Sequence, residues 1–223
     1  MVVKPANGVY GQGVQIIQRG HDNRWMDGSG QAFTTQSIAC YCANWSSFER
    51  FMVQQKIHNH PRITALTGIN TLQTVRVITV ATRRSEPGEI ILANWRIAGS
   101  ESVVDNFDYG RGGNLIADID IANGEIRQVV GSRLNRQGIE KIDKHPLTGI
   151  SIKGFTLPHW EEVRRAVTNG TVHFAPLRLI GWDVALTPDG PMLIEANAWF
   201  DAGQNAFRKL PILIQKMKAV RSK

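Results

Sequence analysis

An α+β fold built mainly on antiparallel sheet is predicted for this chain of 223 residues. From residue 74 onward the sequence holds several β-branched and apolar runs that are separated by turn residues, as expected of neighbouring strands. One of the turns contains Asn123-Gly124, a dipeptide that favours a tight antiparallel hairpin. Helical spacing returns only after these strands, at residues 159–170. This mixture of strands and helices indicates an α+β protein built on antiparallel sheet.

The first 57 residues are expected to form a small lobe. The strand MVVKP opens it and is followed by a glycine-rich loop and a second strand, GVQIIQR. Residues 21–30, HDNRWMDGSG, are expected to form an exposed connection rich in turn residues. A short helix capped by Ser46 and Ser47 is expected to run through Arg50, and the strand FMVQQKI then ends the lobe at Ile57.

Residues 58–223 are expected to form the larger lobe around an antiparallel sheet. Its predicted strands are TVRVITVAT, EIILANWRIA and the two arms of NLIADIDIANGEIRQVV. The predicted helix HWEEVRRAVTNG follows, with Gly170 as its C-cap. An amphipathic basic helix from about Asn205, interrupted by Pro211, is expected to end the chain.

Composition and charge limit the classes of function. Hydrophobic residues make up 42% and charged residues 20%, no apolar run approaches the roughly 20 residues of a membrane-spanning helix, and the N-terminus lacks a secretory pattern. We therefore expect a cytoplasmic protein without a membrane partner. The net charge of +7 favours anionic partners, but aromatic residues do not alternate with the basic clusters, which argues against nucleic acid. Cys40 and Cys42 supply neither a zinc set nor a disulfide framework.

The segment GWDVALTPDGPMLIEAN places polar residues in what otherwise reads as a buried hairpin. Glu195 and Asn197 are two residues apart, so their side chains share one face of a strand. If the two arms pair across the turn at residues 187–191, Asp183 lies opposite Glu195. Burying carboxylates is costly unless a cation compensates them, and such oxygen ligands suit Mg²⁺. A solvent-facing hairpin whose polar residues alternate by chance is the alternative.

A second pattern lies between the first two predicted strands. Gly8, Gly11 and Gly13 let backbone amides wrap around an anion, and Lys4 adds a positive charge. The spacing differs from the GxxxxGK[ST] phosphate loop and from the dinucleotide fingerprint. A glycine-rich hairpin turn without a ligand is the alternative when this loop is taken alone.

The two patterns together, in this order, resemble the ATP-grasp superfamily. The similarity continues through TVRVITV, ANWRIAG, VVDNFDYGRGGNLIADID and LRLIGWDVALTPDGPMLIEAN, and so covers nearly the whole chain. The segments NTLQTVRVIT, VDN…GG and HPLTG are most similar to the alpha-L-glutamate ligase-related branch, which includes the sugar-transfer-associated ATP-grasp proteins. The resemblance implies two α+β lobes with antiparallel sheets that clasp a nucleotide, residues 1–57 carrying the phosphate loop and residues 58–223 the metal and substrate site.

The resemblance also implies roles for particular residues. Those that would bind ATP, the last three chiefly through their main chain at adenine, are Lys4, Gly8, Gly11, Gly13, Gln54, Gln55 and Ile57. The catalytic residues would be Arg76 and Arg96, near the γ-phosphate and the acyl group, and Asn106, which precedes Gly112-Gly113 in the motif that shapes the substrate side of the site. The Mg²⁺ ligands would be Asp183, Glu195 and Asn197. For the two arginines, pairing with a surface carboxylate is the alternative, and the histidines at 58, 60 and 145 are expected in loop or core roles.

The implied activity is that of an ATP- and Mg²⁺-dependent carboxylate-amine ligase, which forms an amide through an acyl phosphate. Its partners would be ATP, a small-molecule or peptide carboxylate and an amine acceptor. The ligases that it resembles carry an N-terminal domain upstream of the segment at which Met1 begins, so we expect that domain to be lacking here or supplied by a partner. The alternative is a truncated or degenerate ATP-binding module without catalysis of its own.

Overall fold

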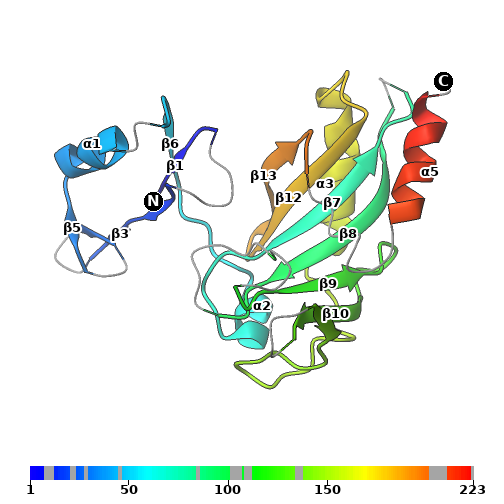
Figure 1. The fold of residues 1–223 in the computed structure, drawn as a ribbon, viewed down its shortest axis with the longest axis horizontal. Coiled ribbons are helices and arrows are strands. Elements are labelled where there is room, and N and C mark those ends of the chain that lie inside the picture. Colours follow the sequence, from blue (N-terminus) through cyan, green and yellow to red (C-terminus); the bar gives the residue numbers. More distant parts are fainter. Residues whose placement is uncertain are drawn as a thin grey trace. The chain divides into compact units, whose positions relative to one another are not determined.

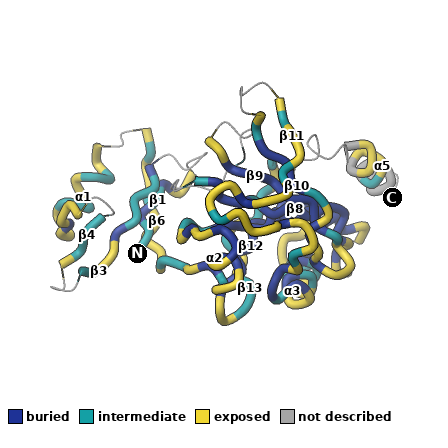
Figure 2. The backbone as a smooth tube through the Cα atoms, turned by 90° about the horizontal axis from the view of Figure 1, so that it is seen from below, coloured by how far each residue is buried: buried dark blue, intermediate teal, exposed yellow. Residues whose placement is uncertain are grey.

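The structure is a computed structural model that describes residues 1–7, 13–20, 24–27, 30–44, 47–83, 86–100, 107, 112–133, 138–200 and 210–221. It divides into two compact units, Met1–Ile57 and His58–Lys223. Figure 1 colours their elements along the sequence, and Figure 2 shows where the chain is buried.

The first unit is organised around a three-stranded antiparallel sheet. Strand β1 (Val2–Pro5) lies between β2 (Gln15–Ile16) and β6 (Phe51–Gln54), as the apolar runs at the start and end of this lobe predict. Its small core is formed by Val3, Ile17 and Phe33, against which Met1, Trp25, Ile38, Cys42 and Phe51 pack.

A second small sheet corrects one prediction for this unit. Strand β4 (Trp25–Met26) pairs with β3 (Gln18–Arg19) and with β5 (Ala32–Phe33). The interpretation of residues 21–30 as connection throughout is therefore wrong, because Trp25 and Met26 form a strand and Trp25 packs on the unit's core.

The helix of the first unit also lies elsewhere than predicted. Helix α1 spans Thr35–Asn44, whereas residues 47–50 are not helical. The reason is a reciprocal cap, in which the Thr34 amide donates to Ser37 Oγ (2.7 Å) and the Ser37 amide donates to Thr34 Oγ1 (3.1 Å). These two bonds satisfy amides that a helix start leaves open.

The second unit contains a seven-stranded sheet in which all neighbouring strands are antiparallel. Its order is β11-β10-β9-β8-β7-β12-β13. The strands are β7 (Thr74–Val80), β8 (Glu89–Ile97), β9 (Leu115–Ile119), β10 (Ile126–Ser132), β11 (Ile139–Lys141), β12 (Leu179–Thr187) and β13 (Gly190–Asn197). The predicted turn at Asn123-Gly124 joins β9 to β10, and Gly124 adopts the positive φ of 77° that favours glycine.

Helices α2 (Pro61–Thr67) and α3 (Trp160–His173) cover one face of this sheet and enclose the main core. The buried residues of α3 recur at helical spacing, at Trp160, Val163, Val167 and Thr171. Strands β7, β8, β9 and β12 are buried almost throughout, whereas the edge strands β11 and β13 are half-buried or exposed (Figure 2). Gly170 lies inside α3 rather than at its C-cap. The close Trp182 ring, which a Cβ at this position would meet at 2.9 Å, accounts for the glycine.

Helix α5 (Leu210–Arg221) lies beside β8 in Figure 1, and Lys216 Nζ binds both oxygens of Glu89 at 2.7 Å. Pro211 is the second residue of this helix rather than an interruption, and in the first turn its missing amide hydrogen is not needed. Residues 201–209, where the helix was expected to begin, lie outside the described residues. Within the described part of the chain, every helix is too short or too polar to cross a membrane.

Gly99 allows the end of β8 to approach the chain before β9. A Cβ at this position would lie 1.9 Å from the Gly113 carbonyl oxygen. Because the neighbouring atom belongs to the backbone, the clash can be relieved only by moving the chain. We expect Gly99→Ala to lower the free energy of unfolding by about 3 kcal/mol, because overpacking forces the two segments apart. Urea denaturation measures this, with Gly112→Ala as the matched control, since a Cβ at Gly112 has nothing within 4 Å. Equal losses in the two variants would contradict the packing argument.

The N-termini of α2 and α3 meet at two histidines. His60 Nδ1 accepts the Arg62 amide (3.1 Å) as the N-cap of α2, and the rings of His60 and His159 form a T-shaped pair with centroids 5.3 Å apart. His159 is the N-cap residue of α3, with φ 56°, and its buried Nε2 has no hydrogen-bond partner among the described residues. The N-terminus of α2 carries partial positive charge, so this arrangement favours the neutral form of the His60 imidazole.

Stability is therefore expected to fall on mild acidification. Burial lowers the pKa of His60 below 6.5, and the neighbouring His159 and Arg62 lower it further. The contribution of neutral His60 to the free energy of unfolding is complete above pH 6.5. It is lost as the pH falls through the lowered pKa of the folded protein, because the unfolded chain binds the proton first. The variant His60→Asn keeps an acceptor at the N-cap, which is worth about 1 kcal/mol, but has no group that titrates in this range. Its thermal unfolding midpoint should therefore change less between pH 7 and pH 5 than that of the native protein. The exposed His58→Asn is the control, and an unchanged slope in His60→Asn would contradict the assignment.

Candidate functional site

A row of polar side chains crosses one face of the seven-stranded sheet. Residues directly opposite each other on neighbouring strands share a face, and the printed registers link six of them across six strands. From β13 to β10 they are Glu195, Asp183, Arg76, Asn94, Asp118 and Gln128. Four are buried, with exposed fractions of 6% for Asp183, 7% for Arg76, 2% for Asn94 and 7% for Asp118. The other face carries the apolar core, so this row is a local departure from the composition of the sheet.

An ion pair lies at the centre of the row. Arg76 Nε donates to Asp183 Oδ1 (2.5 Å) and Arg76 Nη2 donates to Asp183 Oδ2 (2.9 Å), which is the two-pronged geometry that suits a guanidinium. Arg96 Nη1 reaches Asp183 Oδ2 at 3.4 Å from the next strand beyond Arg76. One buried carboxylate therefore faces two guanidinium groups. These three groups together carry a net positive charge.

The hairpin of β12 and β13 brings Glu195 opposite Asp183, as its polar pattern predicts. A bulge makes this possible. Val184 pairs with Leu193 but Asp183 pairs with Glu195, so Ile194 is an extra residue in β13. Without it the register of the tight turn would place Ile194 opposite Asp183 and turn Glu195 to the other face. Glu195 is exposed while Asp183 is buried, so the two carboxylates differ in their access to water.

Asn197 lies on the same face, opposite Gly181. Its Nδ2 is buried and has no hydrogen-bond partner among the described residues. Gly181 leaves room for Phe200, since a Cβ at 181 would lie 2.6 Å from Phe200 Cγ. The Phe200 ring lies 6.0 Å from the Arg76 guanidinium carbon and shields one side of the ion pair from water.

The comparison with protein families decides what this arrangement belongs to. The model of the sugar-transfer associated ATP-grasp family matches residues 1–218. The chain belongs to this family. The α+β fold with antiparallel sheets that the sequence predicts is thereby confirmed as that of an ATP-grasp domain, and such proteins are typically ATP-dependent ligases that bind ATP with Mg²⁺. A search of the curated proteins finds no match.

The residues predicted to bind ATP lie in the first unit of this ATP-grasp chain. Lys4 is on β1, Gln54 ends β6, and Gln55 and Ile57 follow it. Gly13 has a φ of 67°, which glycine adopts without strain. Gly8 and Gly11 of the predicted phosphate loop, and Asn106 of the predicted substrate side, lie outside the described residues.

Three members of the polar row were missed by sequence reasoning, namely Asn94, Asp118 and Gln128. Asn94 and Asp118 each interrupt an apolar strand, in ILANWRI and LIADI, just as Asp183 and Glu195 interrupt theirs. That interruption was the available signal. Strand registers show that these residues continue the row beyond Arg76, which a single sequence cannot show.

The donor set of the ATP-grasp site fits the Mg²⁺ that the family implies. No cluster of three His, Cys, Asp or Glu side chains occurs in the described part of the chain, but Asp183, Glu195 and Asn197 offer two carboxylates and an amide on one face. A carboxylate has about four acceptor positions, and three contacts from Arg76 and Arg96 leave one on Asp183. Turning the Asn197 amide would place its oxygen where the unpartnered nitrogen now lies. Hard oxygen ligands of this kind suit Mg²⁺.

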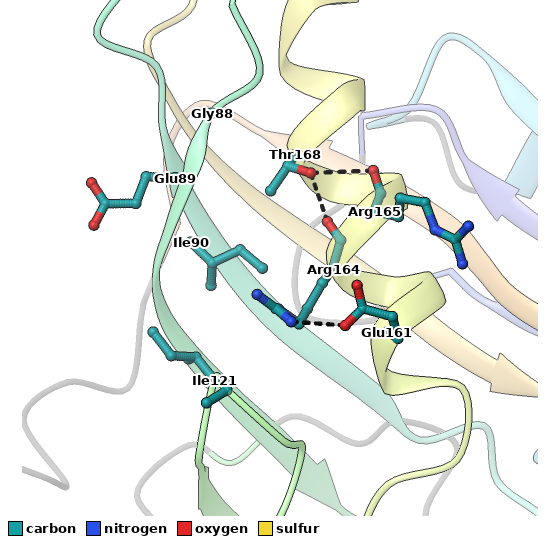
Figure 3. A pocket seen from close by; sticks show the side chains of 9 residues that line it. Gly88, Glu89, Ile90, Ile121, Glu161, Arg164, Arg165 and Thr168 are labelled. Atoms are coloured by element: carbon teal, nitrogen blue, oxygen red, sulfur yellow. Dashed lines mark hydrogen bonds and ion pairs between the residues drawn. The ribbon is translucent and has the colours of Figure 1, made fainter.

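A separate hollow of about 530 Å³ lies between β8, the turn after β9 and helix α3. In Figure 3 the Arg164 side chain extends along this hollow and is tied to Glu161, with Nη1 to Oε2 at 2.7 Å. The other carboxylate that lines the hollow, Glu89, is bound by Lys216. None of the residues predicted for the ATP-grasp site lines it, so we do not place the nucleotide or the substrates there.

Proposed function

We propose that this ATP-grasp protein is an ATP- and Mg²⁺-dependent ligase that joins a carboxylate to an amine through an acyl phosphate. The observation that supports the proposal best is the convergence of Arg76 and Arg96 with Asp183, Glu195 and Asn197 on one sheet face. Cationic groups beside a set of oxygen ligands suit the transfer of an anionic phosphoryl group.

In the first step an oxygen of the substrate carboxylate attacks the γ-phosphorus of ATP. A bond forms between that oxygen and phosphorus, the bond to the β-phosphate oxygen breaks, and ADP leaves with its electron pair. Arg96 is placed to hold the reacting anion, while Arg76 keeps Asp183 oriented. We expect positioning and charge balance to supply most of the acceleration.

In the second step the amine nitrogen attacks the acyl carbon. The carbon-oxygen bond to phosphate breaks, inorganic phosphate leaves, and the amine releases its proton, so that an amide results. Asn94 and Asp118 extend the row away from the hairpin, and we propose that these buried polar groups help to orient an acceptor bound beside Arg76.

Asp183, Glu195 and Asn197 would hold Mg²⁺, which when bound neutralises charge on phosphate oxygens. Lys4, the loop of Gly8, Gly11 and Gly13, and the main chain at Gln54, Gln55 and Ile57 are proposed to bind the nucleotide. The ammonium group of Lys4 and the glycine amides suit phosphate. The peptide groups after β6 offer the donor and acceptor that adenine needs.

Trapping with hydroxylamine tests the reaction without knowledge of the amine. The protein is incubated with ATP, Mg²⁺ and hydroxylamine over a panel of amino acids, dipeptides and hydroxy acids, and hydroxamate and ADP are quantified. The proposal expects equal amounts of both products with at least one carboxylate. Asp189→Asn, an exposed carboxylate in the turn of the same hairpin, should retain this activity. ATP binding without hydroxamate or ADP from any carboxylate would instead identify a nucleotide-binding module.

A further inference from the structure

We propose that Trp199 is the surface on which a flat ring of one substrate stacks, either a sugar ring or an aromatic ring. The exposure of the indole and its place beside the ion pair are features of the structure itself. That the stacked ring belongs to a substrate of a ligase rests on the proposed function.

Trp199 differs from the other tryptophans of the second unit. It is 95% exposed, whereas Trp95, Trp160 and Trp182 are exposed by 0%, 5% and 1%. Indole has a large apolar surface and is highly buried in most proteins, because its contact with water is unfavourable. A ligand that covers Trp199 therefore removes a large apolar area from water.

The backbone at Trp199 is held on both sides. Strand β13 ends at Asn197, which pairs with Gly181, and the chain then bends at Ala198 and Trp199. Phe200 returns to the same glycine, since a Cβ at Gly181 would lie 2.6 Å from Phe200 Cγ. Both ends of this bend therefore meet one residue of β12, which fixes the backbone position from which the indole projects.

The bend lies on the face of the sheet that carries the ion pair. Gly181 and Asp183 are two residues apart on β12, so their Cβ directions point to one face. Phe200 occupies the space at Gly181, and its ring centre lies 6.0 Å from the Arg76 guanidinium carbon. Because consecutive Cα atoms are about 3.8 Å apart, Trp199 borders the site where the reacting groups would bind.

A flat ring is the kind of ligand that suits this surface. The face of an indole is negative and its edge is positive, so the face attracts C–H groups that point at it and rings that stack with an offset. A hexose ring offers a row of axial C–H groups, and an aromatic ring offers its face. An acyclic chain makes a smaller contact and loses more conformational entropy when it is ordered. Since adenine is proposed to bind at the main chain after β6, the ring at Trp199 is assigned to a substrate.

Fluorescence quenching tests this surface without requiring catalysis. Acrylamide quenches indoles that are exposed to water, and the difference between the native protein and Trp199→Leu isolates the contribution of Trp199. The probes are glucuronate, glucosamine and phenylalanine, with gluconate, glucamine and leucine as their acyclic counterparts, each added in the presence of Mg²⁺ and ATP. We expect at least one ring compound to protect Trp199 and its acyclic counterpart to leave it quenched. Protection by glucuronate or glucosamine identifies a sugar ring, and protection by phenylalanine identifies an aromatic ring.

Two substitutions separate stacking from a structural role. Calorimetry should show that Trp199→Leu weakens the protecting compound about 10-fold, and that Trp199→Phe, which keeps a smaller aromatic face, weakens it about threefold. Neither variant should change the thermal unfolding midpoint, because Trp199 is 95% exposed. Leu193→Ala is the control, since this exposed residue of the same strand pairs with Val184 of the main core and lies on the other face. It should bind the ring compound as the native protein does.

Three results would overturn the proposal. Protection of Trp199 by Mg²⁺ and ATP alone would place the nucleotide there. Protection that grows with protein concentration would show that a second copy of the chain covers the indole. Quenching that no ring compound reduces would show that Trp199 binds no ring.

The hydroxylamine assay keeps this proposal distinct from the proposed function. Ring binding that depends on Trp199 in a protein that forms no hydroxamate would leave the stacking surface standing and would reject the ligase alone. Hydroxamate formation that is unchanged in Trp199→Leu for every carboxylate, together with unprotected Trp199, would leave the ligase standing and would reject the stacking surface alone.

Discussion

Replacing Arg76 by methionine is expected to lower the free energy of unfolding by about 3–5 kcal/mol. The change removes both N–H groups that bind Asp183, and it leaves a carboxylate in a position that is only 6% exposed. The remaining contact, from Arg96 at 3.4 Å, is too long to replace two direct bonds. Chemical denaturation of the native and variant proteins measures the loss.

A paired substitution separates the loss of the pair from the loss of packing. Arg76→Met combined with Asp183→Leu replaces both charges by apolar groups, and should recover most of the stability, because the cost arises from an uncompensated buried charge. The same double variant should lose Mg²⁺-dependent nucleotide binding. If the single and double variants were equally unstable, the ion pair would not be the source of the effect.

Glu195→Gln is expected to raise the Kd of ATP in the presence of Mg²⁺ by about 100-fold or more, which corresponds to about 2.7 kcal/mol. The substitution removes a ligand charge at nearly constant shape, and Glu195 is exposed, so little stability should be lost. Because Asp183 has one acceptor position left after its arginine contacts, it cannot replace the missing carboxylate as a two-oxygen ligand.

Calorimetric titrations with and without Mg²⁺ measure this effect. Without the metal the native and Glu195→Gln proteins should bind ATP equally and weakly. Asp189→Asn, which removes an exposed carboxylate from the turn of the same hairpin, should bind as the native protein does. Native-like, Mg²⁺-dependent binding by Glu195→Gln would place the metal on other residues.

The large sheet was predictable because most of its strands can be identified from their local sequence. The runs around Thr74, Glu89 and Leu115 are apolar and β-branched enough to exclude other elements, and a two-residue turn signal joins β9 to β10. The family could also be inferred, since its motifs occur in order along the chain and the family model covers residues 1–218.

The small elements of the first unit were harder to predict. Strand β4 is two residues long and gains its stability from pairing on both sides and from the packing of Trp25, neither of which shows in local composition. Gly170 illustrates the same limit in the second unit. It looks like a helix stop, yet it lies inside α3, and the reason for a glycine here is the ring of Trp182, which leaves no space for a side chain.

The sequence by itself determined which chemical groups the hairpin offers, because Asp183, Glu195 and Asn197 and the spacing between them are local facts. Only the tertiary structure decided how they meet. The extra residue at Ile194 turns Glu195 toward Asp183, and Arg76 reaches the same carboxylate from 107 residues away in the sequence. Bulges and strand order depend on packing across the whole sheet, so local propensity does not contain them. The difference between Arg76, which binds Asp183 at 2.5 and 2.9 Å, and Arg96, which reaches it once at 3.4 Å, exists only in that assembled sheet.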